Sequence, residues 1–151
     1  MLNLEFFFKS RWPNAERIRK IRGNFYDHYG LDGVIGVIDG THIAIRPPKQ
    51  DPENYINRKG FHSVIIQAVV DDSRSFTDIY VGWPGSVHDA RVFRRSPLFE
   101  NLESGGFCTS GTYLLGDAAY PLKRYMIVPF KDNGHLNAAQ KRYLFFHYVT
   151  W

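Results

Sequence analysis

Three aspartates in this sequence stand at the edges of apolar runs, where a carboxylate could do chemistry. Asp39 ends the run Gly33–Ile38, Asp117 ends the run Tyr113–Gly116, and Asp89 stands at the expected start of a helix. In an open α/β sheet, strand ends and helix starts converge on one crevice where ligands bind. Carboxylate oxygens suit Mg²⁺ and Mn²⁺, and two such ions about 3.5–4 Å apart can hydrolyse a phosphodiester. The three acids therefore predict a divalent-metal site.

Each acid also has a purely structural explanation. Asp39 followed by Gly40 between apolar runs is a hairpin-turn signal. Asp89 fits the third position of a helix capped by Ser86, and Asp117 fits a turn ahead of a proline. For any one of these acids the structural explanation is favoured. For all three acids to be purely structural, however, their shared placement at the ends of elements would have to be a coincidence three times over. Three acids gathered without a metal would repel one another, so at least one should have a raised pKa.

Two histidines stand beside these acids, and other catalytic motifs are absent from the sequence. His42 and His88 could be metal ligands or could orient the carboxylates, although a lone histidine on a strand is more often structural. The remaining histidines show no ligand spacing, and no Cys/His cluster indicates zinc. No glycine-rich phosphate loop or nucleophile elbow is present.

Basic residues close to the acids predict contacts with DNA phosphates, which position a duplex without reading its sequence. The six candidates are Arg46, Arg58, Lys59, Arg91, Arg94 and Arg95. The net charge of +4 fits a polyanionic partner without requiring one. Scattered Lys and Arg also occur on any protein surface, so these residues alone are weak support.

Composition indicates an ordinary globular domain. The chain has 151 residues, of which 44% are hydrophobic and 23% charged, as is typical of one soluble domain. The single cysteine, Cys108, cannot form an internal disulfide, which favours a reducing compartment. No run approaches the ~20 apolar residues of a membrane span, and residues 1–10 lack the features of a signal peptide. We expect a soluble, intracellular protein.

Apolar periodicity and turn residues predict an α/β fold. Helices are expected at 14–30, from Ser86–Asp89 to about 95, at 97–103 and from Asn137 onward. Strands are expected at 34–45, 63–70, 76–81, 113–117 and 126–130, with the second and third forming an antiparallel hairpin. A three-strand meander followed by helix–strand alternation is a mixed α/β sheet.

Four ordered blocks of this sequence resemble the DDE endonuclease domain of PIF/Harbinger transposases and of the domesticated nucleases derived from them. The blocks are Gly33–Ile43, Tyr55–Ser63, Gly82–Arg91 and Leu115–Leu122, and Trp12-Pro13 is similar to the run-in of the family. The resemblance implies an RNase H-like fold and a Mg²⁺ or Mn²⁺ cofactor. It also implies that Asp39 and Asp117 are the first two catalytic acids and that Asp89 is a further metal ligand. It gives His42 and His88 no settled role.

The sequence departs from the family pattern at its ends. The family carries its third acid, a glutamate, on the helix after the fifth strand, but no Glu follows Asn137 here. Glu100 and Glu103 stand on a different element. The resemblance therefore implies a truncated, C-terminally incomplete domain: 1–30 would be a helical lead-in and 31–151 the endonuclease domain lacking its C-terminal part. A poorly packed last helix would leave Phe145, Phe146 and Trp151 exposed.

These observations predict a metal-dependent DNA endonuclease domain that is impaired by loss of its third acid. The alternative is a catalytically inactive, domesticated DNA- or protein-binding module. A metal phosphohydrolase built on His88-Asp89 is weaker, because no other histidine has matching spacing. The resemblance further implies a Myb-like partner protein that supplies DNA targeting and nuclear import. We expect a nuclear location, or a cytoplasmic one until the partner imports the chain.

Overall fold

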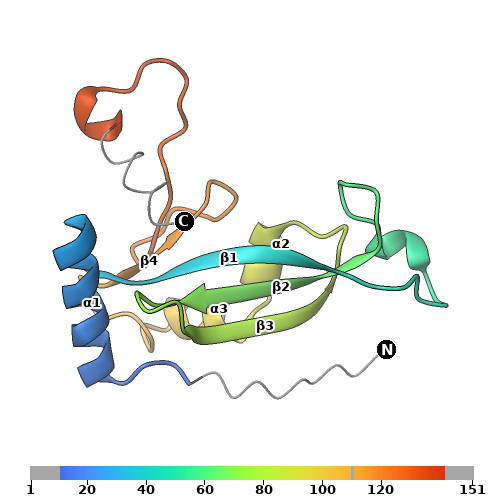
Figure 1. Cartoon of the computed structure of the whole chain (residues 1–151), viewed down its shortest axis with the longest axis horizontal. Helices are drawn as coiled ribbons and strands as arrows, with labels where there is room; N and C mark the ends of the chain where they lie inside the picture. Colours follow the sequence, from blue (N-terminus) through green and yellow to red (C-terminus); the bar gives the residue numbers. More distant parts are fainter. Residues whose placement is uncertain (1–10, 110, 142–151) are drawn as a thin grey trace.

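A computed structural model describes residues 11–109 and 111–141 of the chain. It contains one five-stranded sheet in the order β3-β2-β1-β4-β5 (Figure 1). Phe145, Phe146 and Trp151, for which the sequence predicted exposure, lie outside the described residues. Within the described part, no helix is long and apolar enough to cross a membrane.

The central strand β1 (Val34–Ala44) is paired along both of its edges. It runs antiparallel to β2 (Ser63–Val70) and parallel to β4 (Tyr113–Gly116). The outer strands extend the sheet on each side, with β3 (Phe76–Pro84) antiparallel to β2 and β5 (Met126–Ile127) parallel to β4. The three-strand meander and the helix–strand alternation that follows it are confirmed, and this mixed sheet has the RNase H-like architecture.

One face of the sheet is covered at its end by α1 (Ala15–Tyr29). Ile21 and Phe25 of this helix are 2% and 3% exposed and pack with Val34 and Val37 of β1. The predicted helix ends are confirmed. The Asn14 side chain accepts a hydrogen bond from the Arg17 N–H, and Gly30 ends the helix in a left-handed conformation that suits glycine.

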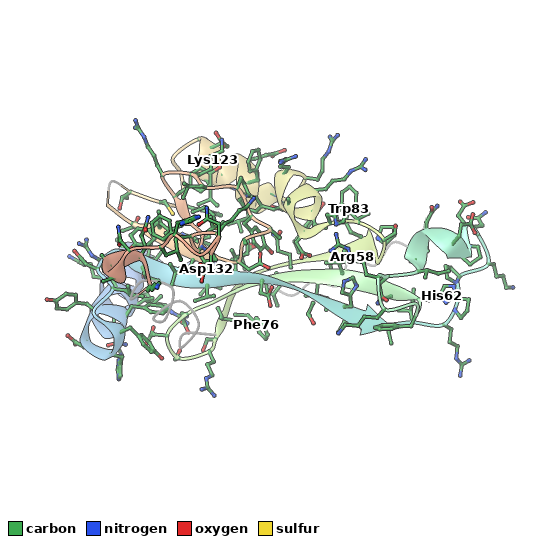
Figure 2. All side chains as sticks on the ribbon, turned by 90° about the horizontal axis from the view of Figure 1, so that it is seen from above. Arg58, His62, Phe76, Trp83, Lys123 and Asp132 are labelled. Carbon is green, nitrogen blue, oxygen red and sulfur yellow. The ribbon has the colours of Figure 1, made fainter. Side chains whose placement is uncertain are left out.

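The opposite face is covered by two short helices, α2 (Asp89–Arg94) and α3 (Pro97–Glu103). Figure 2 shows both helices on one side of the sheet, with Phe76 on the other side. The core here is made by buried residues from both layers, namely Ile35, Ile38, Val69, Phe93, Leu98, Leu102, Leu114 and Met126. This tightly packed layer fixes where α2 begins relative to the sheet.

Several local predictions need correction. Ser86 does not cap α2; the helix begins at Asp89 with His88 at the N-cap, because residues 84–87 form a turn closed by a hydrogen bond from the Val87 N–H to the Pro84 carbonyl. Strand β3 extends three residues further than predicted, and β5 stops at Ile127. A short 3₁₀ helix at Pro52–Tyr55 was not predicted.

The last helix begins as predicted. The Asn137 side chain accepts from the Gln140 N–H, and the Gln140 side chain accepts from the Asn137 N–H, both at 2.9 Å. This reciprocal pair is the Gln form of a capping box, with Asn at the N-cap. The segment from β5 to this helix extends away from the sheet (Figure 1).

A buried carboxylate ties α1 to the turn between β2 and β3. Asp71, 4% exposed, accepts hydrogen bonds from Ser73 and the Ser75 N–H and pairs with the Arg17 guanidinium at 2.5 Å. Burial would raise the pKa of Asp71, but these hydrogen bonds and the Arg17 charge outweigh it and hold the pKa below its ordinary value. The ionised carboxylate is therefore the form that the fold stabilises.

Replacing Asp71 with alanine should lower the free energy of unfolding by about 1–3 kcal/mol, because the hydrogen bonds from Ser73 and Ser75 to the buried carboxylate are lost. Arg17→Ala should cost about 1 kcal/mol or less, since the Arg17 side chain is 47% exposed. Urea unfolding at neutral pH measures both. Arg22→Ala, which breaks a pair on the surface of α1, is the control and should change little. Equal effects from Asp71→Ala and Arg22→Ala would contradict this account.

Candidate functional site

Asp39 and Asp117 occupy corresponding positions on neighbouring parallel strands. Ile38 of β1 pairs with Gly116 of β4, and the two aspartates come directly after this pair. Asp39 lies inside β1 opposite Ala68 of β2, so no hairpin turn forms at this point and that explanation is wrong. The strand register therefore brings the two acids next to each other, with Asp39 within β1 and not at the strand end where the sequence analysis placed it.

Both carboxylates also bond to nearby backbone. Asp39 accepts a hydrogen bond from the Gly40 N–H at 2.7 Å, and Asp117 accepts one from the Ala119 N–H at 2.8 Å. The second bond is an Asx turn, so Asp117 does have the turn role that the structural explanation gave it. A turn role and a ligand role are compatible, because a carboxylate has two oxygens and about four acceptor sites.

Asp89 reaches the same region from α2. A Cβ atom placed on Gly40 would meet the Asp89 carboxylate, so this carboxylate packs directly against the β1 backbone. Side chains alternate along a strand. Asp39 therefore points to the other face, where it lines a shallow pocket with Val37 and Phe76. Asp89 and Asp39 thus approach β1 from opposite sides of the sheet.

The acids act on one another electrostatically. Partial burial raises the pKa of Asp39, and the Asp117 and Asp89 charges raise it further, against the effect of the Gly40 N–H. Burial and the Asp117 charge also raise the pKa of Asp89, although His42, His88 and Arg58 act in the opposite direction. The mutual repulsion expected from the sequence is therefore present, and Asp117 acts on both of the other acids.

The donor chemistry of this region suits a hard divalent ion. The three acids offer carboxylate oxygens, and an ion would relieve the burial and repulsion that raise two of their pKa values. Gly40 has no side chain, and the Asp89 carboxylate occupies the space that a side chain at this position would fill. Across residues 11–109 and 111–141, no three His, Cys, Asp or Glu side chains are close enough together to hold one ion. The bonds of Asp39 and Asp117 to their own backbone, and the approach of Asp89 from the other face, account for this spacing.

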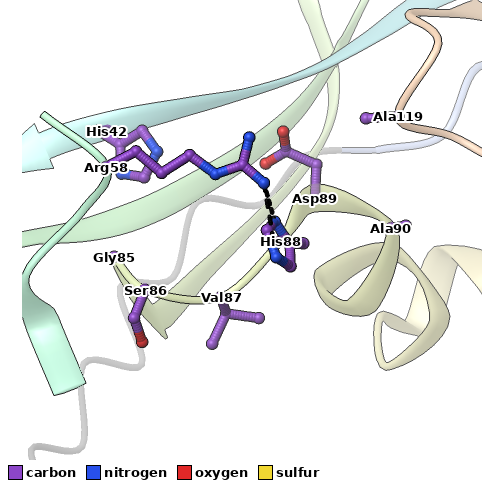
Figure 3. A pocket seen from close by; sticks show the side chains of 9 residues that line it. All are labelled: His42, Arg58, Gly85, Ser86, Val87, His88, Asp89, Ala90 and Ala119. Atoms are coloured by element: carbon purple, nitrogen blue, oxygen red, sulfur yellow. Dashed lines mark hydrogen bonds between the residues drawn. The ribbon is translucent and has the colours of Figure 1, made fainter.

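A pocket of about 450 Å³ lies beside Asp89 on the α2 side of the sheet and is also lined by His42, Arg58 and His88 (Figure 3). The Arg58 Nη2 atom is 2.7 Å from His88 Nδ1. Because a guanidinium only donates hydrogen bonds, His88 Nδ1 must be the acceptor and carries no hydrogen. Figure 3 shows the Arg58 guanidinium between His88 and the Asp89 carboxylate. The pocket thus brings one positive and one negative side chain together.

Arg58 is presented by a turn that a buried asparagine holds in place. Asn57, 5% exposed, accepts from the Lys59 N–H through Oδ1 and donates through Nδ2 to the Ser63 hydroxyl. The same hydroxyl is 3.0 Å from His42 Nδ1. Sequence reasoning gave Asn57 and Ser63 no individual role, although both stand in the block Tyr55–Ser63 that resembles the family. Together they connect His42 to the turn that carries Arg58.

The other basic candidates lie outside this pocket. Arg46 and Lys59 are exposed near its end of the sheet, and Arg91, Arg94 and Arg95 are exposed on α2 and at its C-cap. None of these five lines the pocket. The structure thus brings Arg58 to the acids and leaves the remaining basic residues as a solvent-facing surface.

Comparison with known proteins identifies the class. Residues 38–144 match the family described as DDE superfamily endonuclease, and the chain belongs to this family. The match spans β1 with Asp39, the start of α2 with Asp89, and the end of β4 with Asp117. The resemblance inferred from the four sequence blocks is confirmed.

Individual relatives give a more particular likeness. The chain is 34% identical to HARBI1 of Mus musculus and 33% identical to HARBI1 of Homo sapiens, both named as nucleases, over 88% and 93% of its length. It is 28% identical over 83% of its length to Antagonist of Like Heterochromatin Protein 1 of Arabidopsis thaliana. It spans only 37%, 39% and 34% of these relatives. No solved structure matches the chain.

The raised pKa values predict how stability depends on pH. An acid whose pKa is raised by folding destabilises the folded state when it ionises. The free energy of unfolding therefore begins to fall as the pH rises past the pKa of the unfolded state, and the fall is complete above the raised pKa of the folded state. In EDTA, Asp89→Asn should therefore melt at a higher temperature than wild type at pH 7 and show no such gain at pH 3. Thermal unfolding across this pH range measures the difference.

Asp27→Asn, which removes an exposed acid on α1, is the matched control and should follow wild type at both pH values. A melting temperature of Asp89→Asn below that of wild type at pH 7 would mean that its contacts with His42, His88 and Arg58 outweigh burial and repulsion.

Proposed function

We propose that this chain carries the catalytic centre of a divalent-metal-dependent DNA endonuclease. Asp39 and Asp117 share the ion, and Asp89 completes the site from α2. The observation that carries this proposal is the strand register, which sets Asp39 beside Asp117 in a family of endonucleases. The raised pKa of Asp39 supports it, because carboxylates gathered at a cost in repulsion are typical of functional sites.

The roles of the residues follow from their chemistry. A bound Mg²⁺ or Mn²⁺ ion supplies a nucleophile at neutral pH and stabilises charge on the leaving oxygen. Asp39 and Asp117 hold the ion, and Asp89, which approaches β1 from the opposite face, acts on it through a bound water. Arg58, placed between His88 and Asp89, binds a phosphate oxygen of the DNA backbone. His88 and His42 orient Arg58 and the pocket wall, as their hydrogen bonds to Arg58 and Ser63 suggest.

The glutamate that the family pattern places on the last helix has no counterpart between Asn137 and Trp151. No Asp or Glu follows Asp132 in the sequence. Glu103 is engaged elsewhere, since its carboxylate accepts hydrogen bonds from Lys123 and Tyr125. Glu100 lies on the same short helix α3 and is exposed. We therefore propose that the 151-residue chain on its own cleaves DNA slowly.

A second candidate function is a catalytically inactive module that binds DNA or protein. The Arabidopsis relative, named as an antagonist of a heterochromatin protein, suggests function through a protein partner. In either case we propose a nuclear role in which a Myb-like partner supplies DNA targeting.

Plasmid cleavage separates the two candidates. The 151-residue chain should give little or no nicking of supercoiled plasmid in Mg²⁺ and a trace in Mn²⁺, because catalytic groups that act as a unit lose most of the rate when one is removed. Adding a family-like helix that bears the glutamate should restore nicking, and the same helix with glutamine in its place should not.

In the extended chain, Asp39→Asn or Asp117→Asn should abolish nicking, and Asp27→Asn should leave it unchanged. Failure of the glutamate-bearing helix to restore any cleavage would favour the binding module. Vigorous, Asp117-dependent cleavage by the 151-residue chain itself would show that Asp89 serves as the third ligand.

DNA binding should be weak, tolerant of sequence and steeply dependent on salt, because the available contacts are to phosphates. The triple variant Arg91→Glu, Arg94→Glu, Arg95→Glu should flatten the plot of log affinity against log salt. Fluorescence anisotropy with a labelled duplex measures the slope. The variant Arg19→Glu, Lys20→Glu, Arg22→Glu on α1 is a control of equal charge change on the other face, and a larger effect from it would place the DNA surface there.

A further inference from the structure

Two buried polar side chains on the α2 side of the sheet have no hydrogen-bond partner among the described residues. They are Gln67 of β2, 1% exposed, whose amide nitrogen and oxygen are both unpartnered, and Tyr120, 3% exposed, whose hydroxyl is unpartnered. Buried polar groups in folded proteins nearly always have a partner, because leaving one unpaired costs free energy. Each such group therefore points to a ligand, an ion or a water that it binds.

Gln67 is placed beside Asp89 by the strand register. It pairs with Gly40 across the antiparallel strands β1 and β2, and opposite residues in such a pair project to the same face. On that face the Asp89 carboxylate packs against Gly40. The Gln67 side chain therefore leaves the sheet on the face where Asp89 lies, from the position that neighbours Gly40.

Tyr120 approaches the acids from the loop that follows Asp117. Its ring packs edge-on against Phe93, with centroids 5.6 Å apart, and lies over the Gly116 backbone. Burial raises the pKa of Tyr120, and the charges of Asp89, Asp39 and Asp117 raise it further. The hydroxyl is thus buried within electrostatic range of all three carboxylates.

We propose that Gln67 and Tyr120 form a buried polar wall of the metal centre, where they hydrogen-bond to water in the hydration shell of a bound Mg²⁺ or Mn²⁺ ion. This proposal rests on the ion of the proposed function. Mg²⁺ usually keeps several of its waters when it binds protein, and partners behind the ligands orient them and tune affinity. Gln67 and Tyr120 are positioning residues, since they act on the ion through a water.

Two nearly isosteric variants test the wall, Tyr120→Phe and Gln67→Met, in the full 151-residue chain. Each removes polar atoms that have no protein partner while keeping the packing volume, so thermal unfolding in EDTA should occur at the wild-type temperature or above it. Mn²⁺ titration followed by electron paramagnetic resonance should show affinity about 10–100-fold weaker than wild type, the usual effect of losing such a partner. Variants that are at least as stable as wild type but bind Mn²⁺ more weakly would show that the two side chains serve ion binding. Side chains that only support the fold would lose stability when they are replaced.

Thr77→Val is the matched control. Thr77 is 1% exposed, and its hydroxyl donates to the Val69 carbonyl at 3.3 Å, so its loss should lower stability and leave Mn²⁺ affinity unchanged. Wild-type Mn²⁺ affinity in Tyr120→Phe and Gln67→Met would overturn the inference and leave the proposed function standing. Parallel loss of stability and affinity in both variants would also overturn it, as it would indicate a scaffold role. No Mn²⁺ binding by wild type would overturn the proposed function and the inference together.

Discussion

The pairing of β1 along both edges is the constraint on which the rest of this structure depends. An apolar strand in the middle of a sheet is buried on both faces, and here Val34 to Ile38 lie at or below 7% exposed wherever the side chain is hydrophobic. That burial is possible only because α1 covers one face and α2 with α3 the other. A carboxylate that directly follows these buried residues within the strand leaves the core at a fixed place, which is why Asp39 has a defined relation to Asp117 and to α2.

The acids do not all lie on one face of the sheet, because Asp39 and Asp89 approach β1 from opposite faces. Alternation along β1 sends Asp39 to the side of Phe76 and brings Gly40 against Asp89. The absence of a side chain at Gly40 is what lets α2 approach closely. The sheet thus divides the region into a pocket that contains Arg58 and His88 and a shallow pocket beside Asp39, with Asp117 acting on the acids of both.

Much of the fold could be predicted from the sequence because its signals are local. Apolar runs, the Asn14 cap and the Gly30 stop predicted α1 and the strands well, since hydrophobic period and capping act over a few residues. The predicted start of α2 at Ser86 was wrong, because residues 84–87 form a turn that competes with capping by Ser86. Gln67 was missed inside an apolar strand, where its polar side chain on the buried face was a signal. The contacts of Tyr120 with the acids depend on long-range pairing that no local pattern contains.

The parallel contact between β1 and β4 has a consequence for the order in which this chain can assemble. The meander of β1, β2 and β3 joins strands that are neighbours in sequence, so each pairing closes a short loop at modest entropic cost. Strand β4 must join β1 across the whole intervening meander and both short helices. Non-local pairing of this kind slows folding. Asp39 and Asp117 therefore become neighbours only when the longest loop of the sheet closes.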